Sequence, residues 1–415
     1  MGKRSGGAAG RAGSEFRQEE EKPMGQGGAA GQATGRRKRA SLAVAIVLLL
    51  GLCAGMLEMT APSLSANRDF ISYWAAAKLL ATHGNPYDAA SVLQLENAAG
   101  NRYSRPLVMR NTPTTMFLVA PLGWFSERTA AIAWEMMLIV AALASIRLLQ
   151  PFCPGKVPLI VYFFAPVVDC FLAGQTTILV LLGICLFFRF RERKPWGAGG
   201  GLVLTLLKPH LLLLFWPVLL LEIVRKRNFG LLGGAIGGAA VASALPMAVD
   251  PRIWSQYLLS VRAEHIENQY FPNLACQLRV LIAPNQVGLQ LAPALLGVGV
   301  ALWFWWRTRQ RWQWPREGAL LVAGSALVSP YSFLVDQVLF LPAAMAVYPR
   351  ASKTMQALFV AMNAAAWVLM LEVPEMTSPV TIWFAPALMI WCWWIYRQSG
   401  GVRATDSRER AVAVS

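Results

Sequence analysis

Charged residues are scarce in this sequence: only 14% of its 415 residues are Asp, Glu, Lys or Arg. Because a soluble domain carries about 25% charged residues, an ordinary soluble enzyme is excluded. Acidic residues are the scarcer kind, with 22 Asp and Glu against 38 Lys and Arg, a formal charge of +16. Nucleic-acid-binding proteins can have a similar excess of basic residues. This sequence, however, has 56% apolar residues and a mean hydropathy of +0.44, which such proteins do not have. The composition therefore predicts an all-α protein with many membrane spans and no nucleic-acid partner.

Metal-binding patterns are missing as well. The chain has six Cys and three His, with no CxxC motif and no Cys/His cluster at the spacing of a zinc site. Cys53, Cys170, Cys185 and Cys392 lie in apolar runs, whereas Cys276 lies in a long polar stretch. We expect the thiols to be buried and to pack as small hydrophobic groups.

The chain divides into two tails and one membrane domain. Residues 1–40 are polar and end in a basic run, which predicts a disordered cytoplasmic tail. Residues 41–397 read as the membrane domain, beginning with a retained signal anchor over 41–59, and 398–415 as a second cytoplasmic tail. The apolar stretches predict about twelve transmembrane helices, within a range of roughly ten to thirteen. Several stretches in 157–224 are too short to cross a membrane, so we expect paired short helices or re-entrant segments there.

The basic residues predict the orientation of these spans. Most Lys and Arg residues fall in the two tails and in alternate connections, which places both termini in the cytoplasm by the positive-inside rule. The segments 60–127 and 250–286 then lie on the outer, extracytoplasmic side, with amphipathic helices on the membrane surface. Many acidic residues fall on this side too, and Asp169 and Asp336 lie near the outer ends of their spans, as expected for a functional outer face. The sequence contains no evident internal repeat, which argues against an inverted-repeat transporter.

Asp69 is the first candidate for chemistry. It follows the first predicted span and stands between Arg68 and an aromatic-rich segment. A carboxylate at this place fits a general base that takes a proton from an acceptor hydroxyl. The simpler interpretation is that Asp69 pairs with Arg68 or caps the helix that begins at Phe70.

Lys208 and His210 flank a proline within a long apolar stretch. Ionisable groups are costly there unless they face protein, water or an anion, so the pair fits a phosphate or pyrophosphate head group. Alternatively, Lys208 reaches the interface from a helix end and His210 bonds to a backbone carbonyl.

Further polar residues interrupt later apolar segments. Gln175 follows Gly174 in a short turn, which is either a substrate contact or a polar hairpin. Tyr331 and Asp336 break a hydrophobic run near its outer end, and an aspartate at membrane depth is a site candidate. Arg262 lies in the outer segment 250–286, whose mixed charges fit a sugar or phosphate ligand and equally fit a solvated helix.

An ordered set of motifs resembles glycosyltransferase family 87, the polyprenol-phosphate-mannose-dependent alpha-1,2-mannosyltransferases of the GT-C class. The resemblance covers about residues 42–395 and depends on these short motifs in chain order: Arg68-Asp69-Phe70 with Tyr73-Trp74-Ala75, Asn85-Pro86-Tyr87, Pro113 with Pro121-Leu122, Gly174-Gln175, Lys208-Pro209, and Ser329-Pro330-Tyr331-Ser332. Two positions depart from the family pattern. Val335-Asp336 stands where some members have paired histidines, and Thr176-Thr177 stands where many have Asn.

The resemblance implies a GT-C-type bundle that transfers a hexose, mannose by analogy, from a polyprenyl-phosphate-sugar donor to a glycolipid or glycan acceptor. It implies an inverting reaction at the outer face of the plasma (inner) membrane, with Asp69 as the base. Arg68, Lys208, His210, Arg262, Gln175, Tyr331 and Asp336 would bind the donor phosphate or the substrate. No DxD-like carboxylate pair accompanies Asp69, so neither a metal nor another cofactor is expected.

Two other functions remain as alternatives. A transporter or flippase of lipid-linked saccharides would share aromatic grooves and cationic sites, but it predicts inverted repeats and a charged path to the cytoplasm. A ligase of lipid-linked saccharides predicts large outer loops rich in Arg and His, whereas these loops contain few.

Overall fold

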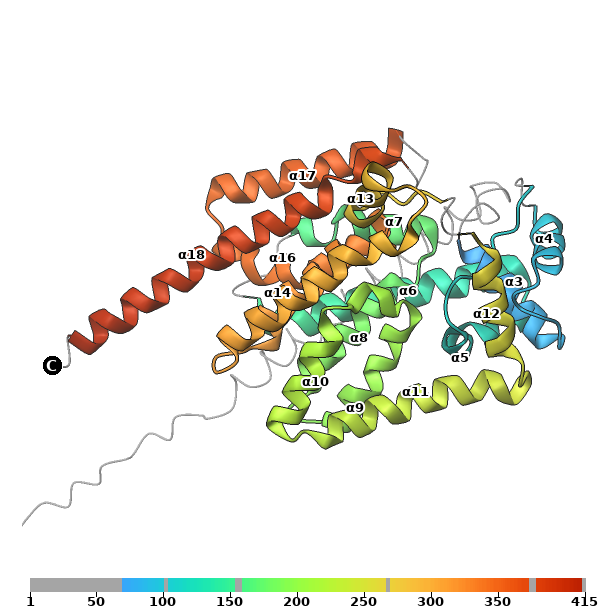
Figure 1. Cartoon of the computed structure of the whole chain (residues 1–415), viewed down its shortest axis with the longest axis horizontal. Helices are drawn as coiled ribbons and strands as arrows, with labels where there is room; N and C mark the ends of the chain where they lie inside the picture. The colour runs from blue at the N-terminus through green and yellow to red at the C-terminus, as the bar shows by residue number, and fades with distance from the viewer. Residues whose placement is uncertain (1–68, 101–103, 154–158, 266–268, 373–377, 413–415) are drawn as a thin grey trace, which may run out of the picture. The chain divides into compact units, whose positions relative to one another are not determined.

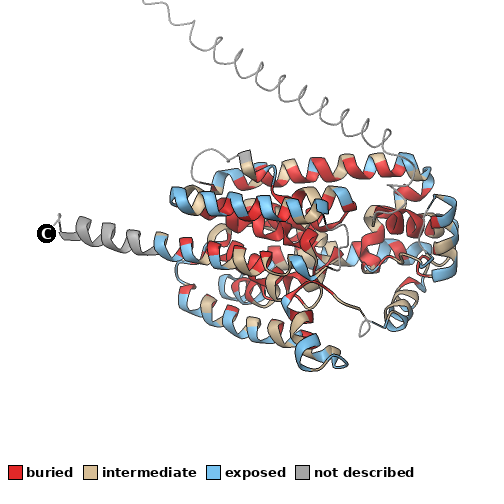
Figure 2. Ribbon diagram, turned by 90° about the horizontal axis from the view of Figure 1, so that it is seen from above, coloured by how far each residue is buried: buried red, intermediate tan, exposed pale blue. Residues whose placement is uncertain are grey.

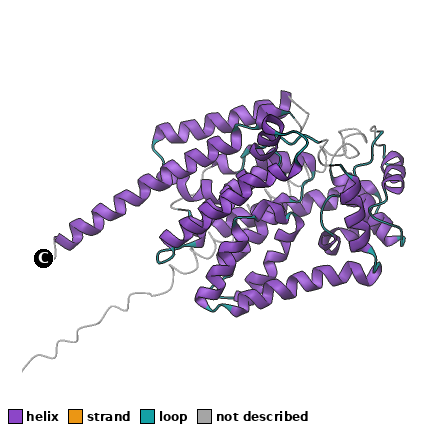
Figure 3. Cartoon of the chain, in the orientation of Figure 1, coloured by secondary structure: helices purple, strands orange, loops and turns teal. Residues whose placement is uncertain are grey.

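The computed structural model describes residues 69–412 except 101–103, 154–158, 266–268 and 373–377 (Figure 1). Every regular element in these residues is a helix, as the composition predicts (Figure 3). The predicted tail 1–40, the predicted span 41–59 and Arg68 lie outside the described residues. The last helix, α18 (Phe384–Val412), includes most of the predicted C-terminal tail.

Five described helical segments are long and apolar enough to cross a membrane. They are Glu127–Phe152, Phe229–Val249, Val287–Thr308, Lys353–Glu372 and Pro379–Ser399, which contain α6 (Glu127–Leu149), α11 (Phe229–Val249), α14 (Ala292–Thr308), α17 (Lys353–Glu372) and the first part of α18. The number of about twelve spans is not confirmed. The chain is nevertheless a helical membrane protein.

Short helices occupy the segment where the sequence predicts them. They are α7 (Ala165–Ala173), α8 (Thr177–Phe190), α9 (Pro195–Gly201), η5 (Leu202–Leu207), η6 (Pro209–Leu212) and α10 (Phe215–Lys226). Later in the chain, α15 (Ala319–Val328), η10 (Leu334–Phe340) and α16 (Leu341–Val347) are similarly short. Prolines stand in the first turn of α9, η6 and α16, because proline fits a helix start and cannot continue a preceding one.

The long helices expose apolar surface. Within an apolar stretch of 18 residues, only 17% of the residues are buried in each of the spans that contain α11, α14 and α17. The corresponding share is 50% in the span that contains α6. Figure 2 shows buried residues gathered on the inner helices and exposed ones along the outer helices. The exposed residues of these three helices include large apolar side chains, among them Ile236, Val241, Leu295, Leu296, Val300, Val360 and Leu371. Such contiguous apolar surface fits contact with lipid rather than with water.

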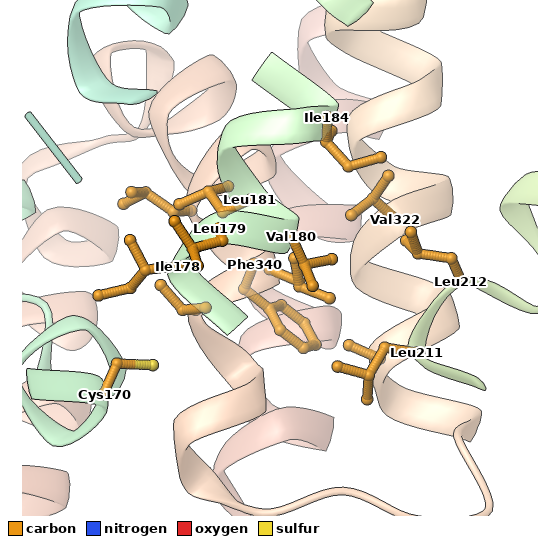
Figure 4. Close-up of a cluster of buried hydrophobic side chains, with 14 of the residues drawn as sticks. Cys170, Ile178, Leu179, Val180, Leu181, Ile184, Leu211, Leu212, Val322 and Phe340 are labelled. Carbon is orange, nitrogen blue, oxygen red and sulfur yellow. The ribbon is translucent and has the colours of Figure 1, made fainter. Parts of the chain in front are cut away.

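The core is built around α8. Figure 4 shows Ile178, Val180 and Ile184 of α8 beside side chains from η6, α15 and η10, namely Leu211, Leu212, Val322 and Phe340, all fully buried. The five described cysteines are free and buried, as predicted, and Cys276 lies in α13 (Leu274–Ile282) rather than in a polar loop.

The helices of the two predicted outer segments contact each other. From 60–127 come α3 (Phe70–Ala81), α4 (Ala89–Ala98) and α5 (Met116–Val119), and from 250–286 come α12 (Ile253–Ala263) and α13. α12 contacts η1 (Pro113–Thr115) of the first segment, and the rings of Tyr87 and Tyr257 lie 5.5 Å apart. The two segments therefore share one side of the protein.

The expectation of amphipathic surface helices in these segments is wrong for α3, which is buried on nearly all sides. Its sequence explains this, because Phe70, Ile71, Trp74 and the alanines that follow leave no polar face. α4, with Val92 and Glu96 as its buried residues, and α12, with Ile253 as its buried residue, have the expected exposed character.

Small residues let α9 and α11 pack backbone to backbone. Gly234 of α11 faces the backbone of Trp196 and Gly200, and Gly199 of α9 faces the backbone of Leu231 and Ala235. A Cβ atom at either glycine would overlap these backbone atoms. Helix contacts of this kind are typical of membrane proteins, where close packing replaces the hydrophobic effect between helices.

We expect Gly234→Ala to destabilise the protein by about 1–3 kcal/mol, the usual range for overpacking. The backbone of α9 cannot move away from the new methyl group as a flexible side chain could. Gly237→Ala, on the same helix, is the matched control, because no atom lies within 4 Å of its added Cβ. In thermal unfolding, the midpoint should be lowered for Gly234→Ala and unchanged for Gly237→Ala. Equal midpoints of the two variants would contradict the close packing.

Candidate active site

Asp69 stands at the start of α3, and its side chain does not cap that helix. Its carboxylate instead accepts a hydrogen bond from the Gln175 side-chain amide. The other end of the same amide is held as well, since the Tyr73 hydroxyl donates to Gln175 Oε1 at 3.3 Å. The capping interpretation of Asp69 is therefore wrong, and the carboxylate is held by a side chain more than a hundred residues away in the sequence.

The turn at Gly174 brings Gln175 to Asp69. Gly174 ends α7 in the left-handed conformation, at φ 70°, which glycine adopts without strain. A Cβ atom added at Gly174 would lie 2.8 Å from Phe70 Cβ, so any side chain at this position would clash with Phe70. Trp134 of α6 fixes the turn from the other side, because its Nε1 donates to the Gly174 carbonyl at 2.7 Å.

Lys208 forms a buried ion pair with Asp336. The Lys208 Nζ lies 2.7 Å from Asp336 Oδ1, and the two side chains are 8% and 0% exposed. Thr177 also donates to Oδ1 at 2.7 Å, and the backbone N–H of Phe333 donates to Oδ2 at 2.9 Å. Lys208 is thus a compensated charge within the protein rather than an unpaired cation.

Asn111 connects these two groups of residues. Its side-chain amide donates to the Leu207 carbonyl at 2.9 Å, next to Lys208, and to Thr176 Oγ1 at 3.3 Å, next to Gln175. The backbone carbonyl of Asn111 accepts from the Tyr87 hydroxyl at 3.4 Å. The outer segment 60–127 is therefore bonded directly to both turns of the site.

Arg110 joins the second outer segment to this network. Its Nε lies 3.0 Å from Glu264 Oε2, and its Nη1 donates to the Tyr331 hydroxyl at 3.1 Å. The Tyr331 ring packs edge-on against His210, with centroids 5.3 Å apart. Ser329 completes the contact, because its hydroxyl donates to the His210 carbonyl at 3.3 Å.

The environment of Asp69 makes its carboxyl a weaker acid. Burial raises its pKa above the ordinary value, while Lys208, the Gln175 amide and Arg110 lower the pKa and Asp336 raises it further. A carboxylate with a raised pKa is a stronger base, which is the property required for general-base catalysis.

Most of the predicted site residues meet in this network. Asp69, Gln175, Lys208, His210, Tyr331 and Asp336 all belong to it. Arg262 does not, since its side chain lies near the end of α12 and makes none of these contacts. The catalytic or binding roles of all these residues stay predictions, because position alone tests none of them.

Sequence reasoning missed three members of the network. Arg110 and Asn111 form a polar pair shortly before the proline-bearing stretch at Pro113, and this polar pair is the sequence signal for them. Trp134 carries no such signal, because it lies in a long apolar helix and is one of 16 tryptophans in the chain. Only the fold shows that its indole reaches Gly174.

The described residues contain no group of three or more His, Cys, Asp or Glu side chains that could hold a metal ion. The expectation of a metal-independent reaction stays a prediction, because this finding concerns the described ranges alone.

An all-helical chain with several candidate spans and a buried, charged network at one side is a polytopic membrane protein with an enzyme-like site. The chain belongs to glycosyltransferase family 87, whose sequence profile matches residues 110–335, more than half of its length. Membership makes it a membrane glycosyltransferase. The match begins at Arg110 and ends just before Asp336, so Asp69 and Asp336 lie outside it. Neither the curated proteins nor the solved structures contain a significant match to the chain.

Proposed function

We propose that this protein transfers a hexose, with mannose as the first candidate, from a polyprenyl-phosphate-sugar donor to a hydroxyl of a glycolipid or glycan acceptor. The reaction takes place at the extracytoplasmic face of the plasma (inner) membrane, and both termini lie on the cytoplasmic side. It inverts the anomeric centre and uses Asp69 as general base. The fold proposed for it is of the GT-C class.

The observation that carries this proposal is the placement of Asp69. Its carboxylate is not used to cap α3 and is held by Gln175. It lies in one of the two segments predicted to face outward, within electrostatic reach of Lys208, Arg110 and Asp336. A single carboxylate in such surroundings is sufficient for an inverting transfer, which requires no covalent intermediate.

In the proposed reaction, Asp69 accepts the proton of the acceptor hydroxyl as the oxygen attacks the anomeric carbon. The bond between that carbon and the phosphate oxygen breaks, and polyprenyl phosphate leaves with the electron pair. Hydrogen-bond donors around the leaving phosphate stabilise its developing charge. His210 and Tyr331 are proposed for this role on one side of the Lys208–Asp336 pair, and Gln175 orients the base.

The sidedness of the proposal follows from the donor. Nucleotide sugars are cytosolic, so an enzyme that acts on the outer face requires a donor that crosses the membrane with its lipid. The basic residues on alternate connections support cytoplasmic termini.

The test uses membrane vesicles that contain the full chain, in right-side-out and inverted preparations. A panel of polyprenyl-phosphate sugars, labelled in the sugar, is added to each. We expect labelled glycolipid or glycan in right-side-out vesicles, unchanged by EDTA. Nucleotide sugars added to the same vesicles, without lipid donor, should yield none.

The other outcomes identify the alternatives. Movement of intact lipid-linked saccharide across the membrane, without a new glycosidic bond, would indicate a flippase. Transfer of a whole lipid-linked oligosaccharide, with no transfer of single sugars, would indicate a ligase. Product that forms only in inverted vesicles would reverse the proposed sidedness.

A further inference from the structure

We propose that Arg110 binds the phosphate of a polyprenyl-phosphate ligand, and that Glu264 occupies the Arg110 guanidinium when no ligand is bound. This inference rests on the proposed function and adds a binding residue that the sequence motifs do not identify. The ligand class is a phosphate ester, whose oxygens take the place of the Glu264 carboxylate.

Lys208 cannot provide this charge without cost. Its ammonium is 2.7 Å from Asp336, which is fully buried and has no other cationic partner among its described contacts. Moving Lys208 to a phosphate would leave the Asp336 carboxylate uncompensated inside the protein, which is strongly unfavourable. The site therefore needs another cation for the leaving group.

Arg110 has the required position and freedom. It is close enough to Asp69 to lower the pKa of that carboxyl. Its side chain is 40% exposed and that of Glu264 is 21% exposed, so the pair is accessible from outside the core. Ion pairs that are partly exposed are weak, typically about 0–1 kcal/mol, whereas arginine binds phosphate through two parallel hydrogen bonds. A phosphate can thus replace the carboxylate without stranding a buried charge.

One unsatisfied polar atom lies close to the Arg110–Tyr331 contact. The Tyr331 hydroxyl accepts from Arg110, and the Tyr331 ring packs against His210. His210 Nε2 is buried and has no hydrogen-bond partner in the part of the chain that the structure describes. Buried polar atoms are rarely left unpaired. A phosphate beside Arg110 would offer an acceptor oxygen to His210 Nε2 and to the proton of the Tyr331 hydroxyl.

The interaction also connects ligand binding to the second outer segment. Glu264 follows α12 directly, and the backbone carbonyl of Glu264 accepts from Gln269 at 3.0 Å. Release of the Glu264 carboxylate by a phosphate would free the end of α12 from Arg110. We therefore expect the Glu264 carboxylate to act as an internal competitor of the ligand.

The experiment measures binding, not transfer, with the purified full chain in detergent. Polyprenyl phosphate, neutral polyprenol and inorganic phosphate are titrated, and Kd is obtained from the ligand-dependent rise in the unfolding midpoint. Glu264→Gln should tighten polyprenyl phosphate binding about two- to fivefold, the value of a partly exposed ion pair. The double variant Arg110→Gln/Glu264→Gln should weaken it about tenfold or more, as expected for a lost charge-assisted hydrogen bond.

Asp250→Asn is the matched control, because Asp250 pairs with the exposed Arg252 in the same outer segment; it should leave Kd unchanged. Unaltered or weaker binding by Glu264→Gln overturns the inference, and so does equal tightening of neutral polyprenol. Inorganic phosphate that responds to Glu264→Gln in the same way identifies the phosphate group itself as the ligand. A response that is larger for polyprenyl phosphate than for inorganic phosphate identifies the lipid head group as the preferred ligand.

Two measurements keep the test independent of variant folding and of the proposed reaction. In the wild-type chain, inorganic phosphate should compete with polyprenyl phosphate and leave polyprenol binding unaffected; absence of competition contradicts the phosphate site. A protein that shows the expected binding but transfers no sugar would refute the proposed transferase and leave the Arg110 site standing.

Discussion

Replacing Asp69 by Asn should reduce sugar transfer by about 10²–10⁴-fold, the usual contribution of a general base. Asn keeps the size of the side chain and an oxygen that accepts from Gln175, so the network can persist. What it loses is the ability to take a proton. The measurement is the initial rate of transfer from the donor identified in the vesicle assay, with donor and acceptor both saturating. An Asn variant that retains most of the activity would remove Asp69 from the mechanism.

The same substitution should not destabilise the protein. The pKa of Asp69 is raised in the folded state by burial, so folding favours the protonated form. A raised carboxyl pKa contributes stability at low pH that is lost as pH rises through the folded-state pKa. At neutral pH the charge is therefore a cost, and Asn should give an equal or higher unfolding midpoint. The apparent pKa of the acid limb of the pH–activity profile should also lie above the ordinary pKa range of aspartate side chains.

Asp88→Ala is the control for a capping role. Asp88 does cap its helix, since its carboxylate accepts from the Ser91 backbone N–H at 2.9 Å. Its replacement should cost about 1 kcal/mol of stability and leave the rate of transfer intact. Loss of activity in both variants would indicate disruption of the outer segment rather than loss of a base.

Lys208→Met should destabilise the protein by about 3–5 kcal/mol, because it leaves the buried Asp336 carboxylate without its counter-ion. The double variant Lys208→Met/Asp336→Asn should recover part of this loss, since neither position is then charged. The asparagine introduced in place of Asp336 has a single acceptor oxygen. That oxygen can still accept from the Thr177 hydroxyl, whereas the Phe333 N–H, which donates to the other carboxylate oxygen, loses its acceptor. Thermal unfolding of the three variants and the wild type forms a double-mutant cycle that measures the coupling directly.

Lys226→Met provides the comparison for an accessible ion pair. Lys226 lies 3.1 Å from Glu222 and is 49% exposed, so its loss should cost at most about 1 kcal/mol. A stable Lys208→Met variant with weakened donor binding would contradict the structural role of Lys208. It would indicate instead that Lys208 binds the donor phosphate.

The fold class was predictable because the amino-acid composition indicates whether the surface of the protein contacts water or lipid. Few charges and long apolar runs identify a helical membrane protein, and the short segments in 157–224 are indeed short helices. The number of spans was not predictable in the same way. Hydropathy does not distinguish a helix that contacts lipid from one buried among other helices, and α8 is buried on nearly all sides. For the same reason, α3 was misjudged as a surface helix.

The site was predictable as a set of residues but not as a set of contacts. Short motifs in order pointed to Asp69, Gln175, Lys208 and Tyr331, and the fold brings them into one network. The contact partners of these residues could not be predicted from local motifs, because an ion pair such as Lys208–Asp336 joins residues 128 positions apart. Sequence reasoning assigned both residues to the donor or substrate, although their charges compensate each other. Arg110 was missed since its significance depends on Glu264 and Tyr331, which no local pattern connects to it.

The Lys208–Asp336 pair also sets an order for biosynthesis. Lys208 is synthesised 128 residues before Asp336, which is roughly 6–26 s at 5–20 residues per second. Throughout that interval the lysine lies in an apolar segment whose counter-ion does not yet exist. The Lys208–Asp336 ion pair can form only after the later helices have been synthesised, so the site is completed late in the synthesis of the chain.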